Sequence, residues 1–200
     1  MRKEILERNT NETKVKAVIN LDEKAENRID TGIGFFDHML NLFAFRAGIT
    51  LKIACTGDLD VDGHHTVEDV GICLGQVISK ALGDKNGIAR YGSARLPMDE
   101  CLAQVDIDIS NRPYLVFNAV FSDRQIGESD KYRVGGFEVE LVEEFFRAVA
   151  VNAGMTLHIN LLYGKNTHHK IEAIFKAFGA ALGQAIKTAG DAVPSTKGVM

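Results

Sequence analysis

The strongest constraint on the fold of this chain is an internal duplication. Three segments of the first half recur in the second half in the same order: residues 47–53 (AGITLKI) as 153–159 (AGMTLHI), 64–68 (HHTVE) as 168–172 (HHKIE), and 74–78 (LGQVI) as 182–186 (LGQAI). Chance similarity between amphipathic segments explains one such match but not three in order. We therefore expect two copies of one structural unit.

Hydrophobic periodicity predicts the elements of each copy. Alternating apolar and polar residues predict strands over residues 14–21, 50–54, 102–109, 115–121 and 156–162. Apolar residues at three- and four-residue spacing predict helices over residues 36–47, 64–82, 141–153 and 168–189. Gly48 and Gly154 follow two of these helices and are expected to cap them in the left-handed conformation. Each half then reads strand, strand, helix, strand, helix. The predicted fold is α+β, a duplicated β-β-α-β-α unit with helices packed on one face of a mixed sheet, as in one domain of a ribosomal small-subunit protein.

The two copies are expected to meet near residues 84–92, where the run DKNG has turn chemistry. This places the first half-repeat at 1–88, the second at 89–190 and a tail at 191–200, within one fused domain. Residues 122–136 are glycine-rich, carry mixed charge and have no counterpart in the first half. They are expected to form a long loop, a feature that tends to be functional in compact domains.

Composition excludes several classes of protein. The chain has 23 Lys and Arg against 27 Asp and Glu, a net charge of −4 without a basic cluster, which argues against sequence-independent binding of nucleic acid. Cys55, Cys73 and Cys101 are odd in number and widely spaced, so we expect neither disulfides nor a thiolate zinc site. No run approaches the roughly 18 apolar residues of a membrane span, and the first residues lack the apolar core of a secretory signal. We expect a cytoplasmic protein that starts where this sequence starts.

Five of the six histidines fall at three places: His38, the pair His64 and His65, and the repeated pair within residues 168–172. On a helix, Glu68 shares a face with at least one histidine of its pair, as needed to hold a cation. Adjacent imidazoles point about 100° apart around the axis, so the two members of a pair are expected to serve different metals or subunits. One such motif is more often a cap or a surface pattern, but two matching copies favour metal ligands. Imidazole and carboxylate without thiolate suit Mn, Fe or Zn, with Mn(II) weakly favoured.

Several longer segments carry a resemblance to a known family. They are residues 31–40 (TGIGFFDHML), 62–69 (DGHHTVED), 98–100 (MDE), 110–113 (SNRP), 164–169 (GKNTHH) and 194–198 (PSTKG). In this order, over nearly the whole chain, they resemble the imidazoleglycerol-phosphate dehydratases of histidine biosynthesis. The resemblance implies a hydro-lyase that converts D-erythro-imidazole-glycerol phosphate to imidazole-acetol phosphate. It also implies two Mn(II) ions per active site, bound where subunits meet, with trimers built into an octahedral assembly of about two dozen chains. Neither nucleic acid nor membrane is an expected partner.

The resemblance also implies the residues of the site. The metal ligands of the family fall here on His38, His64, His65, Glu68, His168, His169 and Glu172. The remaining ligand of the family, often a histidine, falls on Glu144, which stands ten residues before Gly154 as His38 stands ten before Gly48. A carboxylate there can still bind Mn(II). The substrate contacts of the family fall on Glu12, Arg90, Arg112, Lys176, Ser195 and Lys197, and arginine or lysine beside a hydroxyl suits a phosphate monoester.

The implied reaction requires metal ions and a residue that carries a proton. The hydrogen to be removed sits on a carbon without an adjacent carbonyl, so direct removal by a base fails. Two cations on the ring nitrogens would hold the substrate as an imidazolate, which expels the neighbouring hydroxyl and leaves a diazafulvene-like intermediate with an acidic C–H. Glu12 is the first candidate for the acid or base, and Glu68 and Glu172 are better employed as ligands.

Two other classes of protein remain open. A metal-dependent hydrolase would use the same ligands to activate water, and released phosphate would identify it. A non-catalytic protein, either a metal store or a nucleic-acid module, could share the fold because fold does not imply function. The negative charge and the paired histidine motifs argue against the nucleic-acid module.

Overall fold

The computed structural model describes residues 1–121 and 132–198. The first half runs β1 (Lys3–Asn9), β2 (Thr13–Asn20), β3 (Arg28–Asp30), α1 (Gly34–Ala47), β4 (Thr50–Gly57) and α2 (His64–Leu82). The second half runs β5 (Tyr91–Met98), β6 (Cys101–Ile109), β7 (Tyr114–Asn118), β8 (Arg133–Val134), β9 (Phe137–Glu138), α3 (Leu141–Ala153), β10 (Met155–Tyr163) and α4 (Thr167–Ala185). Most of the predicted loop 122–136 lies outside the described residues, and β8 occupies part of its remainder.

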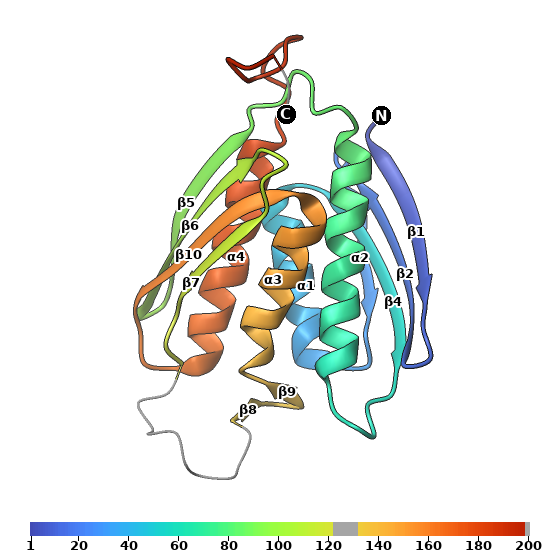
Figure 1. Cartoon of the computed structure of the whole chain (residues 1–200). Helices are drawn as coiled ribbons and strands as arrows, with labels where there is room; N and C mark the ends of the chain where they lie inside the picture. Colours follow the sequence, from blue (N-terminus) through green and yellow to red (C-terminus); the bar gives the residue numbers. More distant parts are fainter. Residues whose placement is uncertain (122–131, 199–200) are drawn as a thin grey trace.

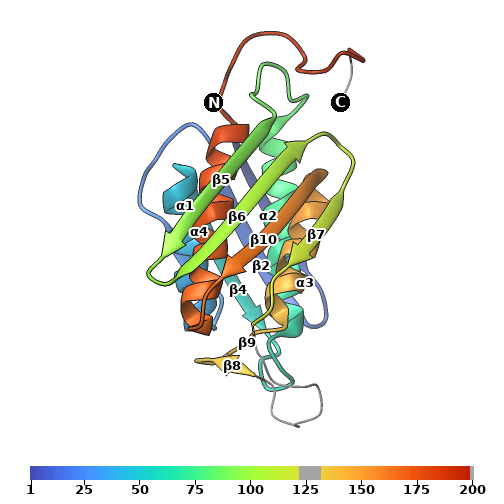
Figure 2. The same ribbon diagram turned by 90° about the vertical axis from the view of Figure 1, so that its left-hand side faces the viewer.

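Two four-stranded sheets enclose the helices (Figures 1 and 2). Their strand orders, β1-β2-β4-β3 and β5-β6-β10-β7, are the same topology used twice, with only the last pair of each sheet parallel. The duplicated α+β class is thereby confirmed, and each sheet has its helices on one face.

The first half has three strands before its first long helix, and the second half has β5, β6 and β7 followed by the two-residue strands β8 and β9. The predicted strands did not include β1, β3, β5, β8 or β9. Leu6 is the only buried residue of β1, and the buried residues of β5 are the small Gly92 and Ala94. These edge strands therefore lack a strong apolar alternation. β3 is too short to show one.

Between the sheets, α3 and α4 lie against the second sheet and α1 and α2 against the first, and the two pairs pack on each other to form the helical layer of the fold (Figure 2). α2 lies beside α3 and α1 beside α4 (Figure 1). Glycines allow both close approaches: a Cβ at Gly75 of α2 would lie 2.8 Å from the carbonyl oxygen of Val149, and one at Gly183 of α4 would lie 2.7 Å from that of Ala47. Gly75 and Gly183 correspond in the duplication, so both helix pairs use the same contact.

Aromatic rings fill the layer where α1, α3 and α4 meet. The ring centroids of Phe43 and Phe178 lie 4.9 Å apart across α1 and α4, and Phe145 stacks on Phe175 at 5.3 Å across α3 and α4. All four rings are fully buried. This apolar centre makes the packing of the two halves specific. No helix in the described ranges has the length and apolar character needed to cross a bilayer.

All four helices begin at the same end of the layer (Figure 1). The predicted caps are confirmed, since Gly48 and Gly154 have φ of 71° and 66° and end α1 and α3. α4 ends at Ala185 rather than at the predicted residue 189, because the chain then turns to pair with the segment before β5. Within residues 191–198 the tail has no helix or strand, as expected from its lack of periodicity.

Candidate metal and substrate site

The helix starts carry every predicted metal ligand, and the tightest group joins both halves. His38 of α1 and His168 and Glu172 of α4 offer ligand atoms that lie within 4.8 Å of one another. Glu172 Oε2 is 3.2 Å from His168 Nε2 and 3.7 Å from His38 Nε2. Across residues 1–121 and 132–198, no other group of three or more His, Cys, Asp or Glu residues is as close. Two nitrogens and one carboxylate fit a divalent metal and leave positions for further ligands.

The carboxylate of Glu172 is held between the imidazoles and a cation. Its other oxygen, Oε1, lies 2.5 Å from Nζ of Lys176, one turn further along α4. Burial alone would raise the pKa of Glu172, but the hydrogen bond from Lys176 and the charges of Lys176 and His38 outweigh burial and lower it. The group is therefore ionised, as a metal ligand must be. Lys176, a predicted substrate contact, lies beside the predicted metal ligands.

The second histidine of each pair is held by a carboxylate. Nδ1 of His65 lies 3.0 Å from Asp58, and Nδ1 of His169 lies 2.8 Å from Glu100. Each carboxylate accepts a hydrogen bond that favours the charged ring, so the pKa of both histidines is raised. A histidine held in this way at Nδ1 presents Nε2 outward, which is the usual arrangement of a metal-binding imidazole.

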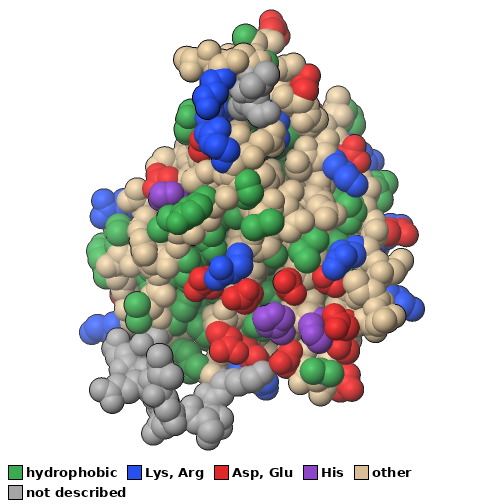
Figure 3. All heavy atoms as spheres, viewed as in Figure 1, with side chains coloured by type: hydrophobic (Ala, Val, Ile, Leu, Met, Phe, Trp, Pro, Cys, Tyr) green, Lys and Arg blue, Asp and Glu red, His purple; other side chains and the backbone are tan. Residues whose placement is uncertain are grey.

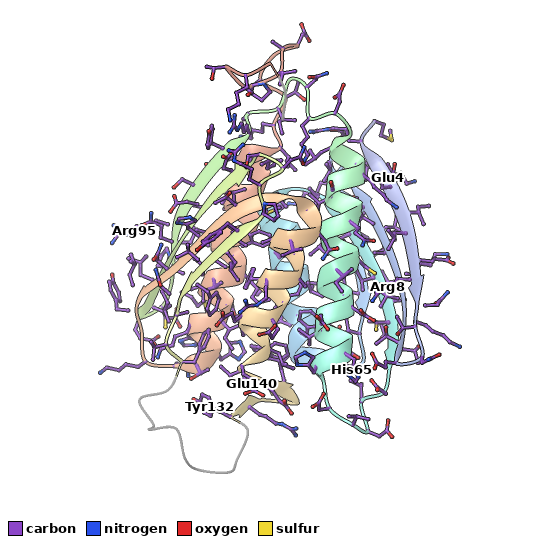
Figure 4. The ribbon with its side chains drawn as sticks, in the orientation of Figure 1. Glu4, Arg8, His65, Arg95, Tyr132 and Glu140 are labelled. Carbon is purple, nitrogen blue, oxygen red and sulfur yellow. The ribbon has the colours of Figure 1, made fainter. Side chains whose placement is uncertain are left out.

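Glu12 reaches the same end from the turn between β1 and β2. Its Oε1 lies 3.7 Å from Nε2 of His65, and its side chain is half exposed. The turn is held on both sides: the N–H of Glu12 donates to Oγ1 of Thr10 at 3.1 Å, and its carbonyl accepts from the N–H of Asp58 at 3.1 Å. Figure 4 shows His65 at the lower end of α2, where this turn meets the helix. A carboxylate in this position can give or take a proton beside an imidazole.

One predicted group of metal ligands does not come together within a single chain. His64, Glu68 and Glu144 correspond by duplication to His168, Glu172 and His38, yet within the described residues their ligand atoms do not form a comparable group. Glu144 instead lies 3.6 Å from Nε of Arg147, one turn further along α3. Its role as a ligand stays a prediction.

The predicted phosphate-binding cations lie at the opposite end of the molecule. Arg90 donates to Asp108 at 2.7 Å and to the carbonyl of Pro194 in the tail at 2.8 Å, and Arg112 also reaches Asp108 at 3.4 Å. The N–H of Arg90 donates to the carbonyl of Ala185, the last residue of α4. His168 is at the start of that helix, about 25 Å away at 1.5 Å per residue. Figure 3 shows one group of Lys and Arg side chains at the upper end and histidines among acidic side chains near the lower end.

Ser195 and Lys197 belong to this cationic end. They lie in one turn of the tail, where the N–H of Lys197 donates to Oγ of Ser195 at 3.2 Å. The tail is joined to the body by Arg90 and by the N–H of Gly87, which donates to the carbonyl of Ala192 at 3.0 Å. The structure therefore groups four of the predicted substrate contacts, Arg90, Arg112, Ser195 and Lys197, apart from Glu12 and Lys176.

Sequence reasoning assigned no role to Asp58, Glu100 or Asp108, which orient the predicted residues. Glu100 was within a family segment, and Asp58 stands in an acidic loop just before the first histidine pair. Asp58 follows a strand whereas Glu100 lies in a hairpin turn, so no common spacing reveals them. The available signals were the family segment for Glu100 and, for Asp58, an acidic loop just before a histidine pair.

Comparison with known proteins places the chain in a family. A model described as imidazoleglycerol-phosphate dehydratase matches residues 31–182. Proteins named imidazoleglycerol-phosphate dehydratase from Exiguobacterium sp. and Acetivibrio thermocellus are 53% and 54% identical, over 99% and 100% of this chain and 98% and 99% of theirs. The crystal structure of the Staphylococcus aureus enzyme matches with a TM-score of 0.81 and 46% identity over 93% of this chain and 99% of that one. The Pyrococcus furiosus enzyme matches with a TM-score of 0.81 and 37% identity over 98% and 100%. The chain belongs to the imidazoleglycerol-phosphate dehydratase family, a family of dehydratase enzymes.

Proposed function

We propose that this chain removes water from imidazole-glycerol phosphate to give imidazole-acetol phosphate in histidine biosynthesis, in the cytoplasm. The observation that carries the proposal is the convergence of His38, His168 and Glu172, brought from two halves of a duplicated chain to one end of the helical layer. The names of relatives that match nearly the whole chain agree with it.

The residues fit a pair of Mn(II) ions. The converging imidazoles and the ionised Glu172 would hold one, and the histidine pairs with their orienting carboxylates offer further nitrogens. When bound, such ions supply Lewis acidity to the nitrogens of the substrate's ring. Zn or Fe would accept the same donors, and a six-coordinate site of several nitrogens and carboxylates weakly favours Mn(II).

The other residues of the chain bind the substrate and move its protons. Glu12 would carry the proton, since its half-exposed carboxylate lies beside His65 and, among the described residues, forms no ion pair with a lysine or arginine. Lys176 would contact the substrate beside the metal. Arg90, Arg112, Ser195 and Lys197 would hold the phosphate through charge-assisted hydrogen bonds.

A complete site needs more than one copy of the chain. The phosphate-binding residues and the metal ligands lie about 25 Å apart along α4, further than one small substrate can span. Neighbouring copies would therefore bring opposite ends together, as in the trimers and the octahedral assembly that the family resemblance implies. Light scattering of the purified protein should then show a mass many times that of one chain.

Mixing two inactive variants tests the shared site. His168→Ala removes a residue at the metal end and Arg90→Ala one at the phosphate end, and each alone should abolish most activity. When the two are dissociated and reassembled together, some sites regain both intact ends, so activity should return. A mixture as inactive as its components would place the whole site within one chain.

Metal dependence of turnover tests the reaction itself. After chelation, the protein should lose activity on imidazole-glycerol phosphate and regain it when Mn(II) is added. Formation of imidazole-acetol phosphate without released inorganic phosphate would support a dehydratase, whereas released phosphate would support the metal-dependent hydrolase. Full activity in metal-free protein would contradict the proposed site.

A further inference from the structure

We propose that Asp69 is a positioning residue that holds the Glu12 hairpin against the histidine pair of α2; this rests on the acid-base role proposed for Glu12. Asp69 lies in α2 and is only 5% exposed. Its Oδ1 accepts from Nε of Arg8 on β1 at 3.0 Å, and its Oδ2 accepts from Oγ1 of Thr13 on β2. One buried carboxylate thus ties both strands of the hairpin to the helix that carries His65.

The duplication shows that the fold does not require a carboxylate at this position. The residue of α4 that corresponds to Asp69 is Ala173, which is fully buried. A buried ion pair seldom stabilises a protein more than apolar packing does, so stability alone does not account for Asp69. We therefore expect the carboxylate of Asp69 to have a role other than stability, and one that only the first half needs.

The second half anchors its hairpin by another route. Glu100, in the turn between β5 and β6, accepts from the N–H of Asn166 at 2.7 Å and lies 2.8 Å from Nδ1 of His169. Here the carboxylate of the turn makes the contact itself. In the first half Asp69 makes the anchoring contact from the helix, which leaves the carboxylate of Glu12 available for chemistry.

Hydrogen bonds connect Asp69 to the backbone of Glu12. Oγ1 of Thr13, which donates to Asp69, lies 3.3 Å from Oγ1 of Thr10. That Thr10 oxygen accepts from the N–H of Glu12 at 3.1 Å and from the N–H of Thr13 at 2.9 Å. Figure 4 places Arg8 and His65 on the same side of the molecule. Loss of the contacts of Asp69 would loosen the turn and move Glu12 away from His65. In the present structure Oε1 of Glu12 lies 3.7 Å from Nε2 of His65.

The test uses the full-length, Mn(II)-loaded assembly. Asp69→Asn keeps the size of the side chain and removes its charge, and Asp69→Ala copies the second half. We expect kcat to fall about 10- to 100-fold, the loss that follows a misplacement of about 1 Å, with KM within about twofold and metal content unchanged. Thr13→Val should behave like Asp69→Asn, and Thr13→Ser should restore turnover because it keeps the hydroxyl.

A control is available on the same hairpin. Arg2 and Asp22, which flank β1 and β2 at the end away from the Glu12 turn, form an ion pair 2.6 Å apart. Asp22→Asn should leave kcat unchanged. Equal losses of kcat in Asp22→Asn and Asp69→Asn would overturn the proposal, because they would show a general effect on the hairpin.

Two further measurements separate positioning from structure. Adding Asp69→Asn to Glu12→Gln should cause no further loss of turnover if Asp69 acts through Glu12, whereas additive losses would overturn the proposal. Hydrogen exchange at residues 10–13 should be faster in Asp69→Asn than in the wild type or Asp22→Asn, and unchanged exchange would overturn it. If Glu12→Gln alone keeps full turnover, the acid-base role of Glu12 fails, and the exchange rates alone then support or overturn the positioning of the hairpin.

Discussion

His38 and Glu172 face each other across the boundary between the two halves, with Nε2 and Oε2 3.7 Å apart. One residue comes from α1 and the other from α4, so their contact depends on the packing of these two helices. The candidate metal site is therefore a product of the duplication, since neither half alone contains the group.

Removing either partner should weaken metal binding. We expect His38→Ala and Glu172→Gln to lower Mn(II) affinity by at least about tenfold, because even the residues that orient ligands contribute about 10- to 100-fold. Elemental analysis after dialysis, together with calorimetry, measures the change. His158→Ala is the control, since this exposed histidine of β10 lies outside the group. Metal content equal to that of the control would exclude both residues as ligands.

Removing the proton carrier should spare the metal. Glu12→Gln keeps the size of the side chain but cannot exchange a proton, so turnover should fall by at least about 100-fold. Metal content and the mass of the assembly should stay those of the wild type. Steady-state kinetics on imidazole-glycerol phosphate measures the effect, and near-normal turnover would remove Glu12 from the reaction.

The orienting carboxylates should set the pH dependence of metal binding. Asp58 raises the pKa of His65 above its ordinary value of 6.5 by stabilising the charged ring. A metal binds the neutral ring, so affinity should rise with pH through this raised value. Asp58→Asn removes the stabilising charge, so the midpoint should move to lower pH, while affinity at high pH falls about 10- to 100-fold through lost orientation.

Calorimetric titrations with Mn(II) over a range of pH measure that midpoint. Asp60→Asn, in the same loop, is the matched control because this aspartate is exposed and makes no contact with His65 among the described hydrogen bonds and ion pairs. Identical midpoints in Asp58→Asn and the wild type would contradict the role given to Asp58.

Adding a methyl group where the two halves pack should destabilise the fold. Gly183→Ala would bring its Cβ to 2.7 Å from the carbonyl oxygen of Ala47, and Gly75→Ala to 2.8 Å from that of Val149. Such overpacking lowers the free energy of unfolding by about 1–3 kcal/mol. Denaturant unfolding measures it against Gly34→Ala, whose new Cβ would meet nothing within 4 Å. If all three variants unfolded at the same denaturant concentration, the structure around Gly75 and Gly183 would accommodate the added methyl groups without loss of stability.

The three cysteines should react slowly in the folded protein. Burial raises the pKa of Cys55 and Cys101 to about 11 and that of Cys73 to about 12. At pH 8 about one thiol in a thousand or fewer is then the reactive thiolate. An aromatic disulfide reagent should modify the native protein far more slowly than the urea-unfolded chain. Comparable rates would mean that the thiols are accessible and have the usual thiol pKa.

Much of the fold and of the candidate site could be predicted from the sequence, because periodicity and repeated motifs are visible along the chain itself. The spacing of the apolar residues predicted α1 to α4, and the left-handed caps at Gly48 and Gly154 followed from glycine alone. The strands β1 and β5 were missed because edge strands bury few large residues, so their pattern is weak. The histidine pairs were found because they repeat.

The sequence by itself determined that the chain is duplicated and which family it resembles, and it predicted which side chains bind metal, phosphate and protons. Only the tertiary structure decided that His38 meets Glu172, that Asp58 and Glu100 orient the histidines, and that the predicted phosphate-binding residues stand at the far end of α4. The physical reason is that residue type and period are encoded along the chain, whereas these distances depend on how α1 packs on α4 and α2 on α3, which no single segment specifies.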